Sequence, residues 1–408
     1  MHVVVEAEDA PPQDARPVEV VERKGLGHPD RVCDAVAEAL SLALSRRGLE
    51  RHGAILHHNV DKALLVGGRS EPRFGGGRVR EPLEIVLAGR AQVPEGHDLE
   101  ALAGECVRDW LRANLRHLDA ERHVRVRARI RPGSADLTEL FERARGGRVP
   151  LANDTSCGVG HAPLSLLERL VLAVEGDLTA PATRDRHPVF GEDVKVMGVR
   201  QDDRIALTVA CALVDRFVSG PDDVAAAKAA LAARARERAT ALGAGELEVA
   251  VNAADDPARG SFYLTVTGTS AEAGDDGQAG RGNRVSGLIA PGRPTTMESV
   301  AGKNPISHVG KLYNLCANLG AEAVVRELAA VEEAECVLVS RIGAPIDAPP
   351  LAALRLRARG GVPEGDRHRA AEILRSEIAR VPALWRELLD GRLALDRWPL
   401  RQPVVAGA

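Results

Sequence analysis

The sequence predicts a mixed α/β protein of the α+β type. Strand-like runs and helical runs alternate in bunches along the 408 residues. Many connections between the strand-like runs are short, which favours antiparallel neighbours. The hydrophobic content of 45% and the charged content of 27% are ordinary for a soluble globular chain. A chain of this length holds core for two or three domains.

The first part of the chain alternates short apolar runs with two long helical patterns. A helix is expected from Asp30 onward, because Val32, Val36, Leu40 and Leu44 keep helical spacing. A second helix is expected over 99–118, and a turn at 131–136 is expected to cap another from about residue 137. Strands are expected at 2–5, 18–21, 82–93 and 123–130, with a hairpin formed by 55–56 and 63–66.

The second part continues the alternation with longer helical patterns. Helices are expected at 164–174, 224–242, 309–330 and 367–389. Strands are expected at 188–199, 205–213, 247–252, 261–267 and 334–342.

Charge and composition exclude several classes of partner. The net charge of −4 and the aromatic content of 2% argue against nucleic-acid binding. The N-terminus lacks the pattern of a signal peptide, and no apolar run is long enough to span a bilayer. The six cysteines show no C-x-x-C spacing and no histidine cluster, which argues against structural zinc. We therefore expect a cytoplasmic chain with reduced thiols.

The chemistry is concentrated between residues 265 and 313. Glycines are dense there, and their backbone N–H groups can approach an anion closely. Among them stand the carboxylates Asp275 and Asp276, which suit Mg²⁺ bound to phosphates. The same stretch carries cations for phosphate oxygens, namely Arg281, Arg284, Arg293, Lys303 and Lys311. The pattern predicts a polyphosphate–metal site, and the alternative is a long solvated glycine loop.

A second anion site is predicted at the start of the first helix. Gly25, Gly27 and Pro29 form a tight loop that places His28 and Asp30 at the helix N-terminus. The alternative is an ordinary aspartate cap beside a surface histidine. The sequence contains no phosphate-binding loop of the Walker type, no dinucleotide-binding glycine motif and no nucleophilic serine elbow.

Six motifs taken together resemble the archaeal-type S-adenosylmethionine synthetase family. They run in order from about Val20 to Pro345, whereas the tail after Pro349 departs from the family. The motifs are GLGHPDRVCD (25–34), LVGGRSEPRFGGG (65–77), ANDTSCGVGHAPLS (152–165), GEDVKVMGVR (191–200), GDDGQAGRGNRV (274–285) and GKNPISHVGKLYN (302–314).

The resemblance implies a fold, a reaction and partners. The fold would have three pseudo-symmetric α/β subdomains, here approximately 1–150, 151–270 and 271–408 of one synthetase unit. The reaction would join ATP and L-methionine into S-adenosylmethionine, releasing triphosphate that is then hydrolysed to pyrophosphate and phosphate. The resemblance also implies Mg²⁺, commonly K⁺, and a homodimer with shared active sites. It implies neither a nucleic-acid nor a membrane partner.

The resemblance also assigns roles to individual residues. The catalytic group would be His28, Lys195, Arg281 and Lys303. Metal would be bound by Asp30, Asp275 and Asp276. Nucleotide would be bound by Gly133, Ser134, Asp136, Asp193, Gly280 and Lys311. Substrate would be bound by Asp154, Cys157 and His161, with Asp154 on the methionine ammonium and the other two near methionine and the base.

Several positions differ from the family pattern. The family usually has aromatic residues at Cys157 and His161, serine at Arg31 and threonine at Val60, and glycine–glutamine where 131–132 stand. Two alternatives to the family reaction therefore stay open. One is a variant synthetase that uses another nucleotide or a methionine analogue. The other is a catalytically idle homologue that binds nucleotide as a regulatory subunit.

Overall fold

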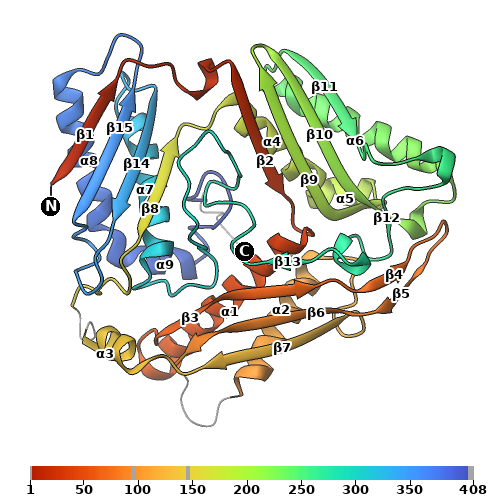
Figure 1. Ribbon diagram of the computed structural model, residues 1–408, viewed down its shortest axis with the longest axis horizontal. Coiled ribbons are helices and arrows are strands. Elements are labelled where there is room, and N and C mark those ends of the chain that lie inside the picture. Colours follow the sequence, from red (N-terminus) through yellow and green to blue (C-terminus); the bar gives the residue numbers. More distant parts are fainter. Residues whose placement is uncertain (1, 93–97, 144–147, 403–408) are drawn as a thin grey trace.

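The computed structural model describes residues 2–92, 98–143 and 148–402. Three β-sheets lie side by side in Figure 1, with the long helices behind them. Each sheet buries one face against its own helices, giving three separate hydrophobic cores. This mixed architecture confirms the predicted α/β fold class.

The sheet at the left of Figure 1 joins the two ends of the chain. Its strand order is β1 (Val3–Glu8), β15 (Leu351–Arg357), β14 (Glu333–Val339) and β8 (Cys157–Ala162). Strand β1 runs parallel to β15, whereas β14 is antiparallel to both of its neighbours. The helices α7 (Val309–Glu327) and α8 (Glu364–Ala379) cover one face, and the short α9 (Leu384–Leu389) follows.

The sheet at the right has the order β11 (Glu246–Val251), β10 (Arg204–Val214), β9 (Phe190–Gln201) and β2 (Val18–Lys24). The two-residue strand β12 (Leu264–Thr265) pairs with the end of β10. The helices α4 (Leu166–Leu178) and α6 (Pro221–Ala241) cover one face, and α5 (Pro181–Arg186) follows α4. A capping box between Ser165 and Glu168 starts α4.

The lower sheet has the order β13 (Gly277–Gln278), β3 (His58–Val66), β6 (Leu83–Ala91) and β7 (Val124–Arg131). The helices α1 (Pro29–His52) and α2 (Leu99–Asn114) cover its inner face, and α3 (Ala135–Arg143) follows β7. A ribbon of β4 (Arg69–Glu71) and β5 (Arg78–Glu81) extends to the right. The glycine-rich stretch thus reaches this sheet through β13.

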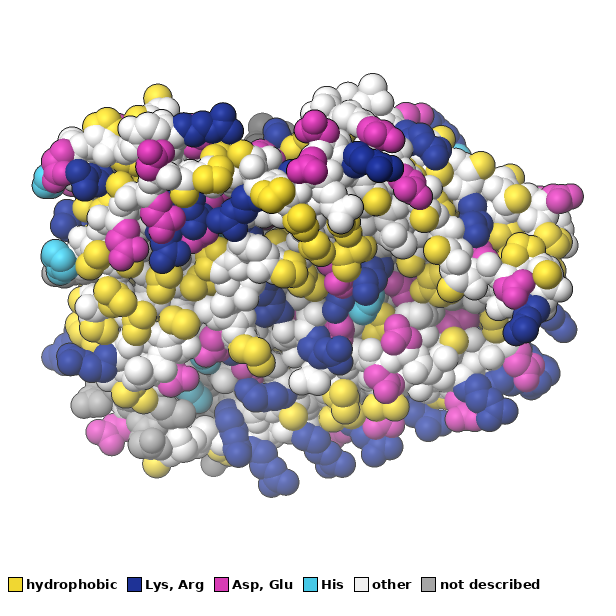
Figure 2. Space-filling view, turned by 45° about the horizontal axis from the view of Figure 1, so that its top comes forward, with side chains coloured by type: hydrophobic (Ala, Val, Ile, Leu, Met, Phe, Trp, Pro, Cys, Tyr) yellow, Lys and Arg dark blue, Asp and Glu magenta, His cyan; other side chains and the backbone are white. Residues whose placement is uncertain are grey.

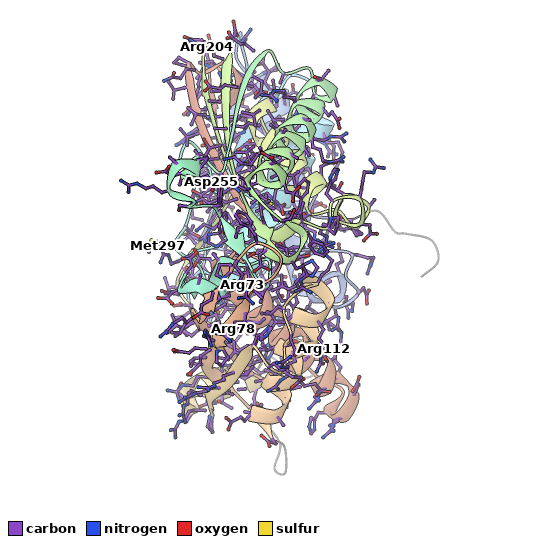
Figure 3. The ribbon with its side chains drawn as sticks, turned by 90° about the vertical axis from the view of Figure 1, so that its right-hand side faces the viewer. Arg73, Arg78, Arg112, Arg204, Asp255 and Met297 are labelled. Atoms are coloured by element: carbon purple, nitrogen blue, oxygen red, sulfur yellow. The ribbon has the colours of Figure 1, made fainter. Side chains whose placement is uncertain are left out.

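The sheet side of the molecule carries no helix over much of its area. The side view in Figure 3 places Met297 and Asp255 on the sheet side and Arg112 of α2 on the helix side. Val18, Leu64 and Val66 are 44–55% exposed on their strands, and Met297 is 98% exposed. Figure 2 shows hydrophobic side chains in a band across the middle and Lys and Arg side chains along the lower edge.

Four expectations about the elements are corrected. The hairpin of 55–56 with 63–66 does not form, because β3 begins at His58 and pairs with β6 and β13. The helix expected over 367–389 is interrupted by a 3-10 turn at Val381–Ala383, where Pro382 cannot continue the helix. The second helix ends at Asn114 rather than at 118. The strand expected over 261–267 shortens to β12.

The three segments predicted from the sequence do not coincide with single sheets. The left sheet takes strands from all three segments, and the lower sheet takes β13 from the third. The subdomain boundaries remain a prediction.

Candidate active site

Two lysines and the start of α1 meet where β2 ends. Lys24 lies opposite Lys195 in the β2–β9 register. The Lys24 Nζ lies 2.8 Å from Asp30 Oδ2 and 2.9 Å from the carbonyl oxygen of Arg281. The Lys195 Nζ lies 3.2 Å from Glu22 Oε1, and its side chain is 41% exposed. Two ammonium groups therefore stand beside the positive end of a helix dipole, which favours an anion here.

His28 caps α1, and its hydrogen bond defines its tautomer. The Nδ1 atom accepts the backbone N–H of Asp30 at 3.2 Å. Burial lowers the pKa of His28, and the Lys24 ammonium lowers it further against the opposing effect of Asp193. A neutral imidazole that accepts at Nδ1 carries its proton on Nε2. His28 can therefore donate one hydrogen bond to an anion at the helix start.

A shared serine joins two of the predicted carboxylates. Ser270 Oγ lies 2.6 Å from Asp193 Oδ2 and 2.9 Å from Asp275 Oδ2. Asp193 also accepts the Ser270 backbone N–H at 2.9 Å and the Tyr263 hydroxyl at 3.2 Å. Because one hydroxyl has one proton, Ser270 can donate to only one of the two carboxylates at a time. Asp193 is thereby fixed by three donors, and Asp275 is the less constrained carboxylate.

The three residues predicted to bind metal have different surroundings. Asp30 is held by Lys24 and by the Gln278 backbone N–H at 2.9 Å. Burial raises the pKa of Asp30, but these two hydrogen bonds outweigh it and the pKa is lowered. Asp276 accepts the Gly67 backbone N–H at 2.8 Å. Within 2–92, 98–143 and 148–402, no three His, Cys, Asp or Glu side chains form a metal-binding group.

Close backbone packing explains part of the glycine motif around this cluster. A Cβ on Gly27 would lie 2.5 Å from the Asp193 backbone nitrogen. A Cβ on Gly67 would lie 2.6 Å from the Cα of Gly274. Side chains at these positions would push apart the segments that carry His28, Asp193 and Asp275.

The glycine-rich loop that follows β13 is hydrogen-bonded to α1. The backbone N–H of Gly280 donates to Asp34 Oδ1 at 2.8 Å. The Arg284 guanidinium donates to the carbonyl oxygens of Gly280 and Gly282, the latter at 2.9 Å. The side chain of Arg281 is exposed and has no hydrogen bond or ion pair among the described residues. The guanidinium group of Arg281 is therefore without a partner among the described residues, on a loop that these hydrogen bonds hold in place.

Lys303 lies in a second cluster, away from His28. Its ammonium lies 2.9 Å from Asp61 Oδ2 and 2.9 Å from Glu298 Oε2. Glu298 also accepts the Ser156 hydroxyl at 2.7 Å, which links Lys303 to the loop of Asp154. Lys303 is 4% exposed, so its charge is compensated inside the chain.

The neighbours of this second cluster include other predicted residues. Lys311 is buried and lies 2.7 Å from both carboxylate oxygens of Glu38. Asp154 is exposed, and its Oδ1 accepts the Thr155 backbone N–H at 2.7 Å. Cys157 is partly exposed at the start of β8.

His161 lies in a buried ion network. It is 5% exposed, and its Nε2 lies 3.4 Å from Glu168 Oε1. Arg293 contacts both Glu168, at 2.8 Å, and Glu333, at 2.6 Å. Burial raises the pKa of Glu168, but hydrogen bonds from His161 and Arg293 outweigh it and lower the pKa. His161 also lines a cavity of about 370 Å³ between α1, β8 and the loop after β13.

The predicted nucleotide turn forms a third location, at the end of β7. A Cβ on Gly133 would lie 2.9 Å from the His57 ring, and Ser134 is exposed. The side chain of Asp136 lies outside the described residues. His57 thus packs beside the turn that follows β7. The neighbouring His58 contacts α1, because its Nε2 lies 2.9 Å from Ser41 Oγ.

The structure adds residues that the motifs did not single out. Lys24, Tyr263, Ser270 and Glu298 each contact a predicted residue directly. Lys24 borders the glycine loop, and Tyr263 is one of only two tyrosines in the chain. For Ser270 and Glu298 the sequence holds no comparable signal.

Comparisons with known proteins agree with these motifs. The family described as S-adenosylmethionine synthetase (AdoMet synthetase) matches residues 1–392. The match includes most of the tail, which corrects the expectation that the chain departs from the family after Pro349.

Curated relatives match along nearly their whole length. A probable S-adenosylmethionine synthase of Aquifex aeolicus is 50% identical over 387 residues, covering 94% of this chain and 96% of the relative. The S-adenosylmethionine synthase of Pyrococcus furiosus is 44% identical, covering 97% and 99%. A solved structure of an unusual S-adenosylmethionine synthetase from Campylobacter jejuni has a TM-score of 0.57 at 15% identity, covering 83% of this chain and 81% of that chain, which supports the fold alone. The chain belongs to the S-adenosylmethionine synthetase family.

Proposed function

We propose that the chain synthesises S-adenosylmethionine from ATP and L-methionine. The methionine sulfur forms a bond to C5′ of ATP, and the C5′–O bond breaks with its electron pair leaving on triphosphate. The triphosphate is then hydrolysed to pyrophosphate and phosphate. The observation that supports this most is the pair of lysines, Lys24 and Lys195, at the N-terminus of α1, with the backbone of Arg281 beside Lys24.

The cluster suits this reaction because a thioether has no proton to lose. The enzyme needs no general base for the first step and must instead stabilise the charge that develops on the leaving oxygen. The His28 Nε2–H, the ammonium of Lys195 and the guanidinium of Arg281 supply donors and positive charge for that oxygen and the phosphates. Asp193, held by three hydrogen-bond donors, is suited to bind a sugar or base donor of the nucleoside.

The same cluster is suited to Mg²⁺. Among the described side chains Asp275 bonds only to Ser270, and Asp276 has one oxygen not used by Gly67. Mg²⁺ binds through one or two carboxylates together with substrate phosphates, and when bound it neutralises phosphate charge. We propose that Asp275 and Asp276 hold the ion, with Asp30 available when Lys24 turns to the phosphates. K⁺ remains a proposal that rests on the family resemblance alone.

A dimer would bring the separate clusters together. Asp154 and Lys303 lie apart from the His28 cluster, and the Gly133 turn lies at the far end of β7. The uncovered sheet side carries exposed apolar residues, including Val18, Leu64 and Val66, as an interface requires. We propose that two copies pack sheet side to sheet side and complete each other's sites. A cytoplasmic location is likewise a proposal; no helix in the described ranges is long and apolar enough to cross a membrane.

The decisive experiment is product analysis with purified protein. The protein is incubated with Mg²⁺, methionine and each of the four nucleoside triphosphates, and sulfonium product, pyrophosphate and phosphate are measured. Using all four nucleotides also tests the base preference, which the changes at Cys157 and His161 leave open. Lys195→Met should abolish most turnover, whereas Lys228→Met, on α6, is the matched control. A folded, dimeric protein that forms no sulfonium product with any nucleotide would refute the proposal.

A further inference from the structure

The C-terminal segment returns to the first turn of α1. Arg31, the residue after Asp30, forms an ion pair with Asp396. The two side chains are 13% and 11% exposed, so the pair is largely withdrawn from solvent. Asp396 lies beyond residue 392, where the match to the family ends. This contact therefore belongs to a part of the chain that the family resemblance did not describe.

Asp396 makes a second contact through its backbone. Its carbonyl oxygen accepts a hydrogen bond from Arg23 Nη1 at 3.1 Å, and Arg23 also donates to the Gly287 carbonyl oxygen. Asp396 has a φ of 58°, in the left-handed region. A Cβ on Gly287 would lie 2.8 Å from the Asp396 carbonyl oxygen, so the two backbones are tightly packed.

The segment on either side of Asp396 is anchored in the core. Leu393 and Leu400 are 2% and 0% exposed. Trp398 packs against two of the three hydrophobic cores. Asp396 is therefore presented from a fixed backbone, and its contacts are not those of a loose tail.

The two contacts flank one ion pair of the active site. Asp396 holds Arg23 through a carbonyl and Arg31 through a carboxylate. These arginines are the direct sequence neighbours of Lys24 and Asp30, whose side chains lie 2.8 Å apart. One residue thus contacts both the first turn of α1 and the end of β2, where Glu175 also holds Arg23. A shift of about 1 Å at such a position can lower turnover about a hundredfold.

We propose that Asp396 is a positioning residue, which acts through Arg31 and Arg23 to hold Lys24, Asp30 and His28 in register. The effect on turnover rests on the proposed synthetase function, whereas the effect on the position of the helix start does not. The family usually has serine at the position of Arg31, and serine could not form this ion pair. The positioning role of Asp396 therefore depends on the arginine that this chain has at position 31.

The test compares Asp396→Asn with Asp390→Asn. Asparagine tolerates a positive φ and keeps the backbone carbonyl, so the first variant removes only the charge. Asp390 pairs with Arg392 at 2.9 Å in the same segment, but both side chains are about half exposed and neither contacts α1. Arg31→Gln and the double variant Arg31→Gln/Asp396→Asn complete a double-mutant cycle for this ion pair.

Two readouts are measured on folded, full-length protein. The first is hydrogen–deuterium exchange of residues 25–34 without ligands. The second is kcat and KM for ATP and methionine. We expect Asp396→Asn to speed exchange at 25–34 and to lower kcat at least tenfold, with each KM changed less than threefold. The double variant should be no worse than either single one, and Asp390→Asn should match the wild type.

The outcomes separate this proposal from the synthetase proposal. Unchanged exchange at 25–34, or faster exchange with unchanged kcat, would overturn the positioning role. A change confined to thermal stability would show that the pair is only structural, which also overturns it. A wild-type protein without synthetase activity would refute the proposed function, and exchange alone would then decide whether Asp396 holds the helix start.

Discussion

Asp34 offers a test of how the loop after β13 is supported. It accepts the Gly280 N–H at 2.8 Å and interacts electrostatically with Arg31 and Arg284. Burial raises the pKa of Asp34 to about 6. The desolvation of its charge outweighs the Gly280 hydrogen bond and the two arginines, which lower the pKa. We predict that Asp34→Asn, which keeps the acceptor for Gly280, stabilises the fold at neutral pH.

The sign and size of this stability change follow from the difference between the pKa of Asp34 in the folded chain and its pKa in the unfolded chain. The carboxyl has its ordinary pKa of 3.8 in the unfolded chain and about 6 in the folded chain. Its contribution to folding is therefore complete below about pH 4 and is lost as the pH rises through 6. At about 1.4 kcal/mol per pKa unit, the full difference is about 3 kcal/mol. Asp34 borders the cavity and keeps some access to water, so we expect a gain of about 1–3 kcal/mol.

Urea unfolding from pH 4 to pH 8 measures this gain. The free-energy advantage of Asp34→Asn should increase between pH 4 and pH 6 and be constant above that. Asp203→Asn, in the exposed turn between β9 and β10, should show no such pH dependence. If Asp34→Asn is less stable than the wild type at pH 8, the arginine contacts outweigh burial and the reasoning is wrong.

Three further predictions concern single side chains. Lys303→Met should lower the free energy of unfolding by about 3–5 kcal/mol in urea titrations, because it leaves Glu298 without a cationic partner and Asp61 with Lys62 alone; a loss equal to that of Lys62→Met, whose side chain is exposed, would contradict this. Ser270→Ala removes a hydrogen bond to a charged group, worth about 1.5–3 kcal/mol, and should lower kcat at least tenfold; steady-state rates within twofold of the wild type would exclude it. Gly160→Ala would place a Cβ 2.1 Å from the backbone of α7 and should lower the melting temperature, whereas Gly176→Ala, with nothing within 4 Å, should not.

Local patterns predicted the helices and most strands well. The helix from Asp30 was predicted because its apolar residues repeat at helical spacing, and it runs over Pro29–His52. The hairpin at 55–56 and 63–66 was wrong because residues 58–66 form one strand, β3, whose partners are β6 and the distant β13. Hydrophobic periodicity indicates which face of a strand is buried, but it does not identify the strand's neighbour in the sheet.

The site was predictable only as far as it lies in motifs. The structure places His28, Asp30, Asp193 and Asp275 near one another, on segments where glycine allows close backbone packing. Lys303 was predicted to bind phosphate oxygens as part of the catalytic group, whereas its ion pairs with Asp61 and Glu298 depend on the packing of distant segments. His161 was predicted to bind substrate, whereas its contact with Glu168 depends on how the chain turns between β8 and α4. These substrate roles remain predictions.

The pairing of the first strand has a consequence for synthesis on the ribosome. Val3 pairs with Ala352, so β1 is synthesised about 350 residues before its partner. At about 5–20 residues per second, the strand waits on the order of 20–70 s for a partner. During that time its run of three valines is an open edge, and the alternating Glu6 and Glu8 are charges that discourage pairing with other nascent chains. The left sheet is thus completed only after every strand of the other two sheets has been synthesised.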